Sequence, residues 1–139
     1  MSFEVKQVGV ILPSGNIADG EFKLWEEDPD EKERVKLSLT FRGKEISVVD
    51  GDFFSAMRSI RRELEKEGMV LNCYGGSKNV YPSPMSQDMG SGWKAYRLTI
   101  GRAARLEDLV SIFEVGPDVV PSSVEEQEAF FKSWAQSLG

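Results

Sequence analysis

The side chains of this sequence that could carry chemistry are few, and they gather in residues 71–94. That segment holds Cys73, the only cysteine of the chain, together with Tyr74, Asn79 and Tyr81. A cysteine acts as a nucleophile only as a thiolate, which requires a neighbouring base or cation. Lysines are the cations that the segment offers, and they are neighbours in sequence only. A lone cysteine in a strand is more often a small apolar side chain, and we interpret Cys73 in this way.

Histidine is absent from the chain, which removes the usual general base at neutral pH. Its absence also removes Ser–His and Cys–His nucleophile pairs, and one cysteine cannot build a cysteine-based zinc site. The sequence contains no phosphate-binding loop, dinucleotide-binding glycine motif, zinc-protease motif or EF-hand pattern. We therefore predict no catalytic residue, no metal site and no cofactor, and we expect a binding protein that is not an enzyme.

Acidic residues outnumber basic ones by 23 to 17, which gives a formal net charge of −6. This charge disfavours direct binding to nucleic acid, which relies on lysine and arginine to neutralise phosphates. It suits a basic protein partner, although solubility alone is the plainer interpretation and stays open. The candidate partner-binding carboxylates are those of the densest acidic run, Glu26, Glu27, Asp28, Asp30 and Glu31. A second acidic cluster comprises Asp118, Glu125, Glu126 and Glu128.

Strands that could position these groups are predicted from a two-residue hydrophobic period. Residues 35–42 alternate apolar and polar side chains, which indicates a strand with one buried face in an antiparallel sheet. The pair Gly43-Lys44 predicts a type II′ hairpin turn into a second strand at residues 45–49. Further strands are expected at residues 4–12, 21–25, 69–74, 94–101 and 109–115.

Two helices are predicted from a change to helical spacing. The first covers residues 52–67, with Asp52 as its N-cap and Gly68 just past its end. Its charged outer face is expected to comprise Arg58, Arg61, Arg62, Glu63, Glu65 and Lys66. The second begins after Ser122 and Ser123, which stand at capping-box spacing from two glutamates. Its apolar face is expected to dock on the sheet of its own chain.

This order of strands, helix, strands and helix predicts an α+β fold in one domain over residues 1–139. We expect a mostly antiparallel sheet with both helices packed on one face. About nineteen residues separate the strands ending near Tyr74 and beginning near Lys94, which is long for an unstructured connection. We expect this segment to be a folded lid, with Met85 and Trp93 buried. It either covers the sheet or forms a recognition loop, for which Tyr74, Asn79 and Tyr81 are the candidate contacts.

The segment NCYGGSKNVYPSPMSQDMGSGWKAYRLTIG and the tail VGPDVVPSSVEEQEAFFKSW resemble small bacterial immunity proteins of polymorphic toxin and contact-dependent growth inhibition systems. The resemblance covers roughly residues 69–138, and no motif that defines binding residues comes with it. It implies a cytoplasmic inhibitor that binds a cognate toxin domain and masks its active site. We expect that domain to be basic, because many toxin domains act on nucleic acid.

Two alternatives to a toxin inhibitor remain open from the residues themselves. One is a small-molecule binder or enzyme that uses residues 74–93, with Cys73 and Lys94 near a pocket. The other is a subunit of a larger assembly, held by the aromatic residues near the C-terminus. The sequence has no apolar run of the ~20 residues that a membrane span requires and no visible signal peptide. We therefore expect a cytoplasmic protein with no membrane partner.

Overall fold

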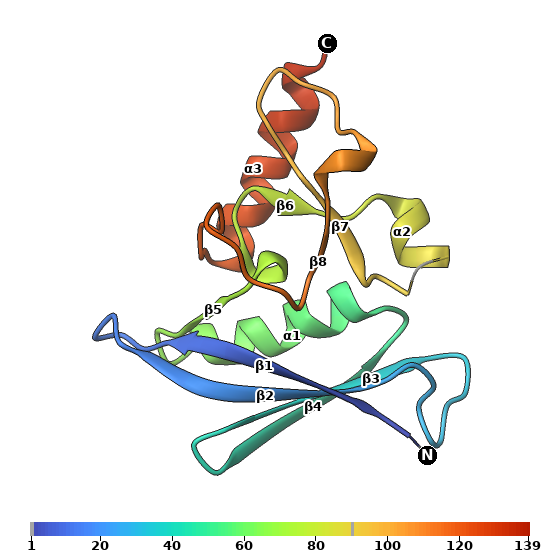
Figure 1. The fold of residues 1–139 in the computed structure, drawn as a ribbon, viewed down its shortest axis with the longest axis vertical. Helices are drawn as coiled ribbons and strands as arrows, with labels where there is room; N and C mark the ends of the chain where they lie inside the picture. The colour runs from blue at the N-terminus through green and yellow to red at the C-terminus, as the bar shows by residue number, and fades with distance from the viewer. Residues whose placement is uncertain (1, 90) are drawn as a thin grey trace.

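The computed structural model describes residues 2–89 and 91–139, and five of the strands form one antiparallel sheet (Figure 1). The order of the strands across this sheet is β4-β3-β2-β1-β5. They are β1 (Glu4–Ile11), β2 (Ile17–Trp25), β3 (Val35–Phe41), β4 (Lys44–Asp50) and β5 (Val70–Asn72). Strands β1 to β4 follow one another as hairpins, and β5 pairs antiparallel with β1 after the chain returns from α1, so the sheet is antiparallel throughout. The predicted α+β class is confirmed.

The β3–β4 hairpin shows how alternation sets the buried face of the sheet. The apolar residues of β3 face the core, and the two strands pair without a break from Val35↔Asp50 to Phe41↔Lys44. The turn consists of Arg42 and Gly43, with φ values of 50° and 77°. Positive φ at both central residues defines a type I′ turn, whose twist matches that of the strands. The prediction of a type II′ turn at Gly43-Lys44 is therefore wrong by one residue and in type.

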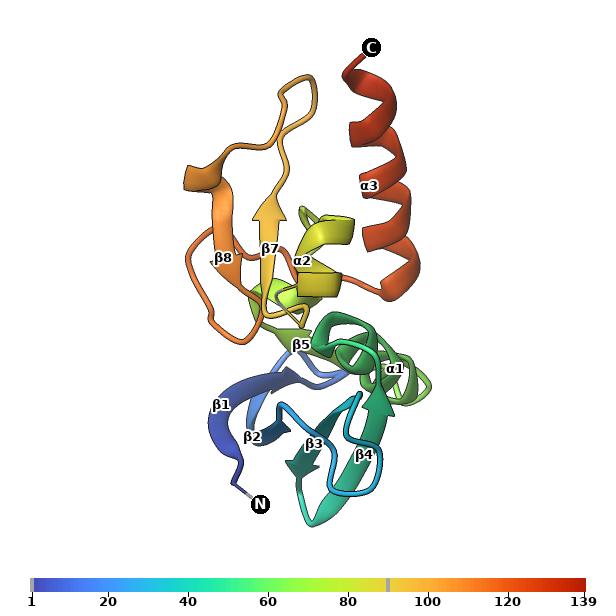
Figure 2. The same cartoon turned by 90° about the vertical axis from the view of Figure 1, so that its right-hand side faces the viewer.

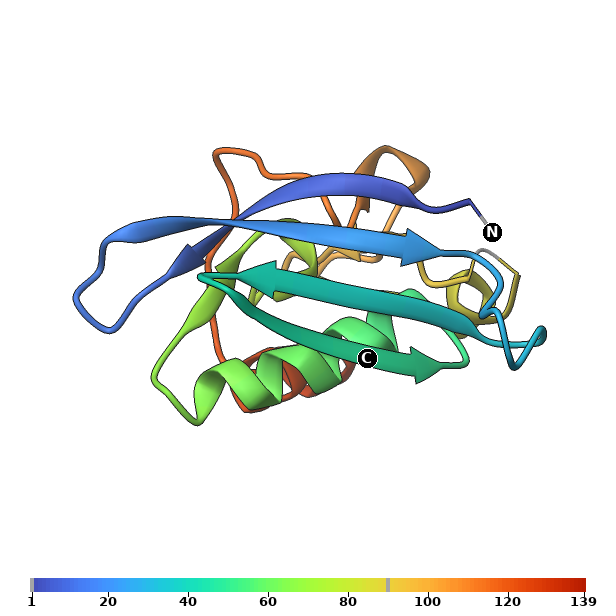
Figure 3. The same cartoon turned by 90° about the horizontal axis from the view of Figure 1, so that it is seen from below.

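Helix α1 (Phe53–Glu65) covers the inner face of this sheet and is capped as predicted. The Asp52 side chain accepts a hydrogen bond of 2.9 Å from the backbone N–H of Ser55. Gly68 ends the segment with a φ of 74°, which an L-residue adopts only at a cost. Figure 3 shows that α1 runs along the β4 side of the sheet.

Arg61 overturns part of the predicted outer face of α1, because its side chain is only 2% exposed. Its guanidinium donates hydrogen bonds to the carbonyl oxygens of Gly75 (3.2 Å) and Ser122 (3.1 Å) and to Oε1 of Gln127 (2.6 Å). The Gln127 amide in turn donates to the carbonyl oxygens of Gly75, Ser77 and Val80. The prediction of a solvated Arg61 is wrong because two main-chain carbonyls and one side-chain amide oxygen, all from later parts of the chain, converge on its guanidinium.

A second, three-stranded sheet lies across α1 from the first one (Figures 1 and 2). Its strands are β6 (Val80–Tyr81), β7 (Lys94–Arg97) and β8 (Leu109–Ser111), all antiparallel. The predicted pairing of the last two strands is confirmed, although both are shorter than expected. Ile100 lies in the predicted strand of residues 94–101 but is 51% exposed, because β7 ends at Arg97.

The segment between β5 and β7 is folded, as predicted, and supplies part of the second sheet. It contains the 3₁₀ turn η1 (Tyr74–Gly76), strand β6 and helix α2 (Pro84–Met89). Trp93 packs edge-on against Phe53 and Phe113, with ring centroids 5.6 and 5.1 Å apart. Met85 is 69% exposed, so the expectation that it is buried is wrong. The short turn η2 (Leu106–Asp108) precedes β8.

Helix α3 (Val124–Ser137) begins with the predicted capping box. The Ser123 hydroxyl accepts from the N–H of Glu126 (3.1 Å), and the Glu126 carboxylate accepts from the N–H of Ser123 (2.9 Å). Both long helices lie on the same side of the five-stranded sheet, α1 directly on it and α3 beyond it against the second sheet (Figure 1). None of the helices in the described residues is both long enough and apolar enough to cross a lipid bilayer.

Candidate functional site

The acidic run forms the loop between β2 and β3, and its backbone is fixed by one of its own carboxylates. Oδ2 of Asp28 accepts hydrogen bonds from the N–H groups of Asp30 (3.0 Å) and Glu31 (2.7 Å). Two main-chain bonds close the loop, from the N–H of Asp28 to the carbonyl of Arg34 and from the N–H of Arg34 to the carbonyl of Glu31. The loop is therefore an ordered turn at one end of the sheet (Figure 3).

Four of the five predicted carboxylates in this loop face solvent, namely those of Glu26, Glu27, Asp30 and Glu31. Asp28 is the exception, because it is only 4% exposed and both bonds of its carboxylate stay within the loop. The structure thus corrects the predicted contact set, in which Asp28 was a surface carboxylate. Its role is to hold the backbone that presents its neighbours.

Tyr74 was a predicted contact for a partner, but its side chain is buried. Only 8% of it is exposed, and its hydroxyl donates to Oδ1 of Asp118 at 2.6 Å. Arg97 donates to the other oxygen of that carboxylate at 3.2 Å. The hydrogen bond from Tyr74 lowers the pKa of Asp118, and the same bond raises the pKa of the tyrosine. Gly116 lies so close that a Cβ atom there would overlap the Tyr74 hydroxyl.

Tyr81 and Asn79 also make their polar contacts inside the chain. The Tyr81 hydroxyl donates to Oε1 of Glu128 at 2.8 Å, and Arg58 donates to the same oxygen at 2.9 Å. The Tyr81 ring stacks on Phe131 with centroids 4.1 Å apart. Oδ1 of Asn79 accepts from the hydroxyl of Ser77. The contacts of Tyr81 attach β6 to α3, whereas the Asn79 bond stays within the central segment. Strand β6 lies away from the acidic loop, which is at the far end of the five-stranded sheet (Figure 1).

The side chains that a small-molecule binder or enzyme would use do not all line one pocket. Cys73 is buried in the core, and burial raises the pKa of its thiol to about 11, which opposes a reactive thiolate. Tyr74 and Lys94 line one open hollow of about 740 Å³, but Cys73, Asn79 and Tyr81 do not line it. Among the described residues, no three acidic or cysteine side chains are grouped so that they could hold a metal ion.

The second acidic cluster is likewise mostly committed to internal contacts. Asp118 binds Tyr74 and Arg97, Glu128 binds Arg58, and Glu126 belongs to the capping box. The backbone bond from its capping partner lowers the pKa of Glu126. Glu125 and Glu126 are both exposed, but the carboxylate of Glu126 is engaged in the capping box, so the cluster presents less acidic surface than its sequence indicates.

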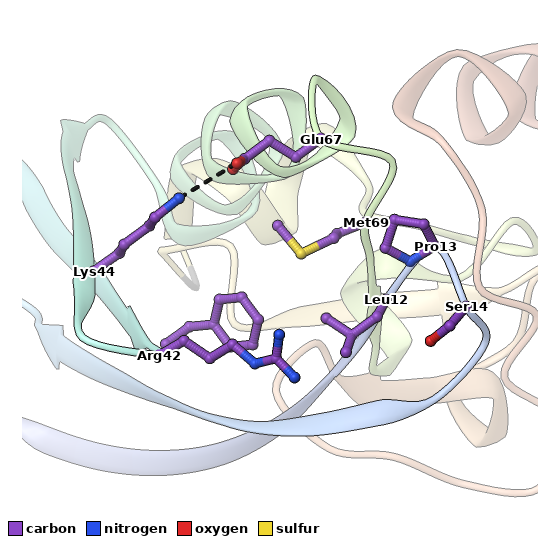
Figure 4. A pocket seen from close by; sticks show the side chains of 8 residues that line it. Leu12, Pro13, Ser14, Arg42, Lys44, Glu67 and Met69 are labelled. Atoms are coloured by element: carbon purple, nitrogen blue, oxygen red, sulfur yellow. Dashed lines mark hydrogen bonds and ion pairs between the residues drawn. The ribbon is translucent and has the colours of Figure 1, made fainter.

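Two neighbouring hollows beside the β3–β4 hairpin were not predicted from the sequence. The first, of about 370 Å³, has apolar walls from Leu12, Pro13 and Met69, with the Lys44–Glu67 ion pair at its rim (Figure 4). The second, of about 700 Å³, lies between β4 and α1 and shares Lys44 and Glu67 with the first. Sequence alternation identifies strands but not the order in which they pair, so it could not reveal that β4 would lie at an edge.

Comparison of the chain with protein-family models and with curated proteins gives no match. Its function is therefore argued from the residues and from their arrangement.

Proposed function

We propose that this chain is a non-enzymatic binding protein, an immunity protein that neutralises a cognate toxin domain by masking its active site. The observation that carries the proposal is the acidic loop of residues 26–34. Five exposed carboxylates, those of Glu26, Glu27, Asp30, Glu31 and Glu33, stand on a backbone that is ordered by two hydrogen bonds to the buried Asp28. An ordered loop loses little conformational entropy on binding, so more of the interaction energy appears as affinity.

The charge of the loop supports a basic partner. Six acidic and two basic residues lie between positions 26 and 34. A toxin domain that acts on nucleic acid needs a basic groove to hold phosphates, and a carboxylate surface that fits this groove would exclude the substrate. Opposite charges also accelerate encounter. In this proposal the inhibitor works in the cytoplasm and contacts neither nucleic acid nor membrane.

The reactive side chains of the central segment are buried or hydrogen-bonded within the chain, which supports a role without catalysis. The thiol of Cys73 is buried, and the hydroxyls of Tyr74 and Tyr81 are both bonded to carboxylates of the same chain. Groups engaged in this way stabilise the packing of the central segment and are not free to act on a substrate. The resemblance to immunity proteins points in the same direction.

The test is protection of cells that produce a toxin domain taken from the reading frames that flank the gene of this protein. Wild-type protein should restore growth and bind the purified toxin domain. A quadruple variant with Glu26→Lys, Glu27→Lys, Asp30→Lys and Glu31→Lys should no longer protect the cells. Its association rate with the toxin domain should fall by at least about tenfold. A control with the same change in net charge reverses four exposed carboxylates elsewhere, Asp19, Glu107, Glu114 and Glu125. Equal protection by both variants would contradict the role of the loop, and no protection by the wild type would contradict the proposal itself.

A further inference from the structure

Strand β4 forms an open edge of the five-stranded sheet in the described part of the chain. In a hairpin with a two-residue turn, the residues that flank the turn form a hydrogen-bonded pair, and hydrogen-bonded and non-bonded pairs then alternate. Lys44 flanks this turn and pairs with Phe41. The main-chain groups of Glu45, Ser47 and Val49 therefore point away from β3. They present a row of three N–H donors and three carbonyl acceptors along the edge.

A groove of about 700 Å³ runs beside this edge, between β4 and α1. Its strand side includes Ile46 and Val48, which are half-buried and face the core side of the sheet. Its helix side includes Ser59, Glu63 and Glu67. The groove thus combines free main-chain groups, an apolar strip and a polar wall, which is the arrangement by which an extended peptide is bound as an added strand.

The charges around the groove favour a basic ligand. Three glutamates line it, at positions 45, 63 and 67, against one lysine, Lys44. Lys44 pairs with Glu67 at 3.3 Å, and Lys66 pairs with Glu63 at 3.2 Å. All four side chains are more than half exposed, and exposed pairs of this kind contribute little. A lysine or arginine of a ligand can therefore replace them at small cost.

We propose that this groove binds an extended segment of a partner protein as a sixth strand on β4. Alternate side chains of the segment face α1, with apolar residues against Ile46 and Val48 and a lysine or arginine between Glu63 and Glu67. A single strand fits because neighbouring strands lie only about 4.8 Å apart. A second copy of this chain fits less well, because α1 runs along the same edge (Figure 3) and the two α1 helices would meet.

The site lies toward the Lys44 end of β4, whereas the acidic loop lies at the opposite end of the sheet (Figure 3). The inference therefore goes beyond the proposed toxin inhibition and does not depend on it. Charge reversal in the loop and charge reversal in the groove should have separable effects.

The experiment uses a synthetic peptide, acetyl-Thr-Val-Thr-Arg-Thr-Val-Thr-amide, and the full chain. A matched peptide carries glutamate in place of arginine, and a third carries N-methyl groups on alternate residues. We expect the arginine peptide to bind about tenfold more tightly than the glutamate peptide, and N-methylation of the residues that face β4 to abolish binding. Amide exchange at Glu45, Ser47 and Val49 should slow in the complex. Binding that is insensitive to N-methylation, or slowed exchange elsewhere, would overturn the proposal.

Variants of the chain provide the reciprocal test. Ser47→Pro removes an N–H that the fold does not use in its own sheet, and proline is tolerated at such edge positions. It should abolish peptide binding, whereas Ser47→Thr should not. Glu63→Lys should weaken binding of the arginine peptide and strengthen binding of the glutamate peptide. Because Glu63 is exposed, this change should not affect folding. Unchanged binding to Glu63→Lys, or dimerisation through β4 that the peptide does not disrupt, would show that the groove has another occupant.

Discussion

Arg61 provides the sharpest test of how this fold is held together. The change Arg61→Met keeps a long side chain in the site but removes the donors for Ser122 and Gln127. The carbonyl of Gly75 keeps a bond from the Gln127 amide at 3.1 Å, so two acceptors lose their partner. Each unsatisfied buried group costs about 1–3 kcal/mol.

Two such groups cost about 2–6 kcal/mol, and the expected loss in the free energy of unfolding is about 3 kcal/mol, in the lower half of this range, because methionine avoids the cost of burying a charge. For a chain of this size, each kcal/mol corresponds to about 3 °C in Tm, so Tm should fall by about 10 °C. Thermal and urea unfolding followed by circular dichroism would measure both quantities. The control is Arg62→Met on the exposed side of the same helix, which should change stability by less than about 0.5 kcal/mol.

A double-mutant cycle with Gln127→Met separates the shared hydrogen bond from general packing. Because Arg61 and Gln127 satisfy each other at 2.6 Å, and each still supplies the Gly75 carbonyl when the other is removed, the two single losses should not add and should differ from the double loss by about 0.5–3 kcal/mol. Equal stability of Arg61→Met and Arg62→Met would refute the reasoning. Strict additivity would show that the two side chains act independently.

Two further predictions concern the Tyr74–Asp118 contact. Gly116→Ala places a Cβ atom against the Tyr74 hydroxyl, so it should destabilise the protein by about 1–3 kcal/mol in urea unfolding. The control Gly51→Ala, whose Cβ atom meets open space, should not destabilise it. Equal effects of the two changes would contradict the close approach of Gly116 to Tyr74. The pKa of Asp118 is lowered in the folded state, so its contribution to stability is present above the unfolded pKa of about 3.8 and is lost as pH falls through the folded value. Asp118→Asn should therefore lower Tm near neutral pH, and its Tm should decrease less on acidification than that of the control Asp19→Asn. Parallel curves of Tm against pH for the two variants would contradict this role of Asp118.

The local patterns of the sequence predicted the elements that depend on near neighbours. Alternation located β3, spacing located α1, and Asp52 and Ser123 marked two helix starts through hydrogen bonds that span only three residues. Arg61 shows where such reasoning fails. It stands among charged residues, and its charge favours the surface although it lies four residues after Met57 and three before Leu64 on the helix. Its acceptors lie 14, 61 and 66 residues away, where no local pattern reveals them.

The candidate sites show the same division. The acidic loop could be identified from composition, because its carboxylates lie close together in the chain. The internal role of Asp28 could not, since an acidic residue that caps a turn and one that faces a partner look alike in sequence. The β4 groove was missed entirely because it exists only through strand order, which brings Lys44 at the hairpin beside Glu67 after α1.

The two proposed surfaces lie at opposite ends of the same pair of strands, and this placement limits how a partner can use them. Strand β3 has seven residues, so a protein that contacts both surfaces must reach along about 24 Å of sheet. A toxin domain of ordinary size can span that distance. If one partner occupies both surfaces, Glu63→Lys and the loop variant should each weaken its binding, and their effects should add because the sites share no contact. If the partners differ, each variant should affect one of them only.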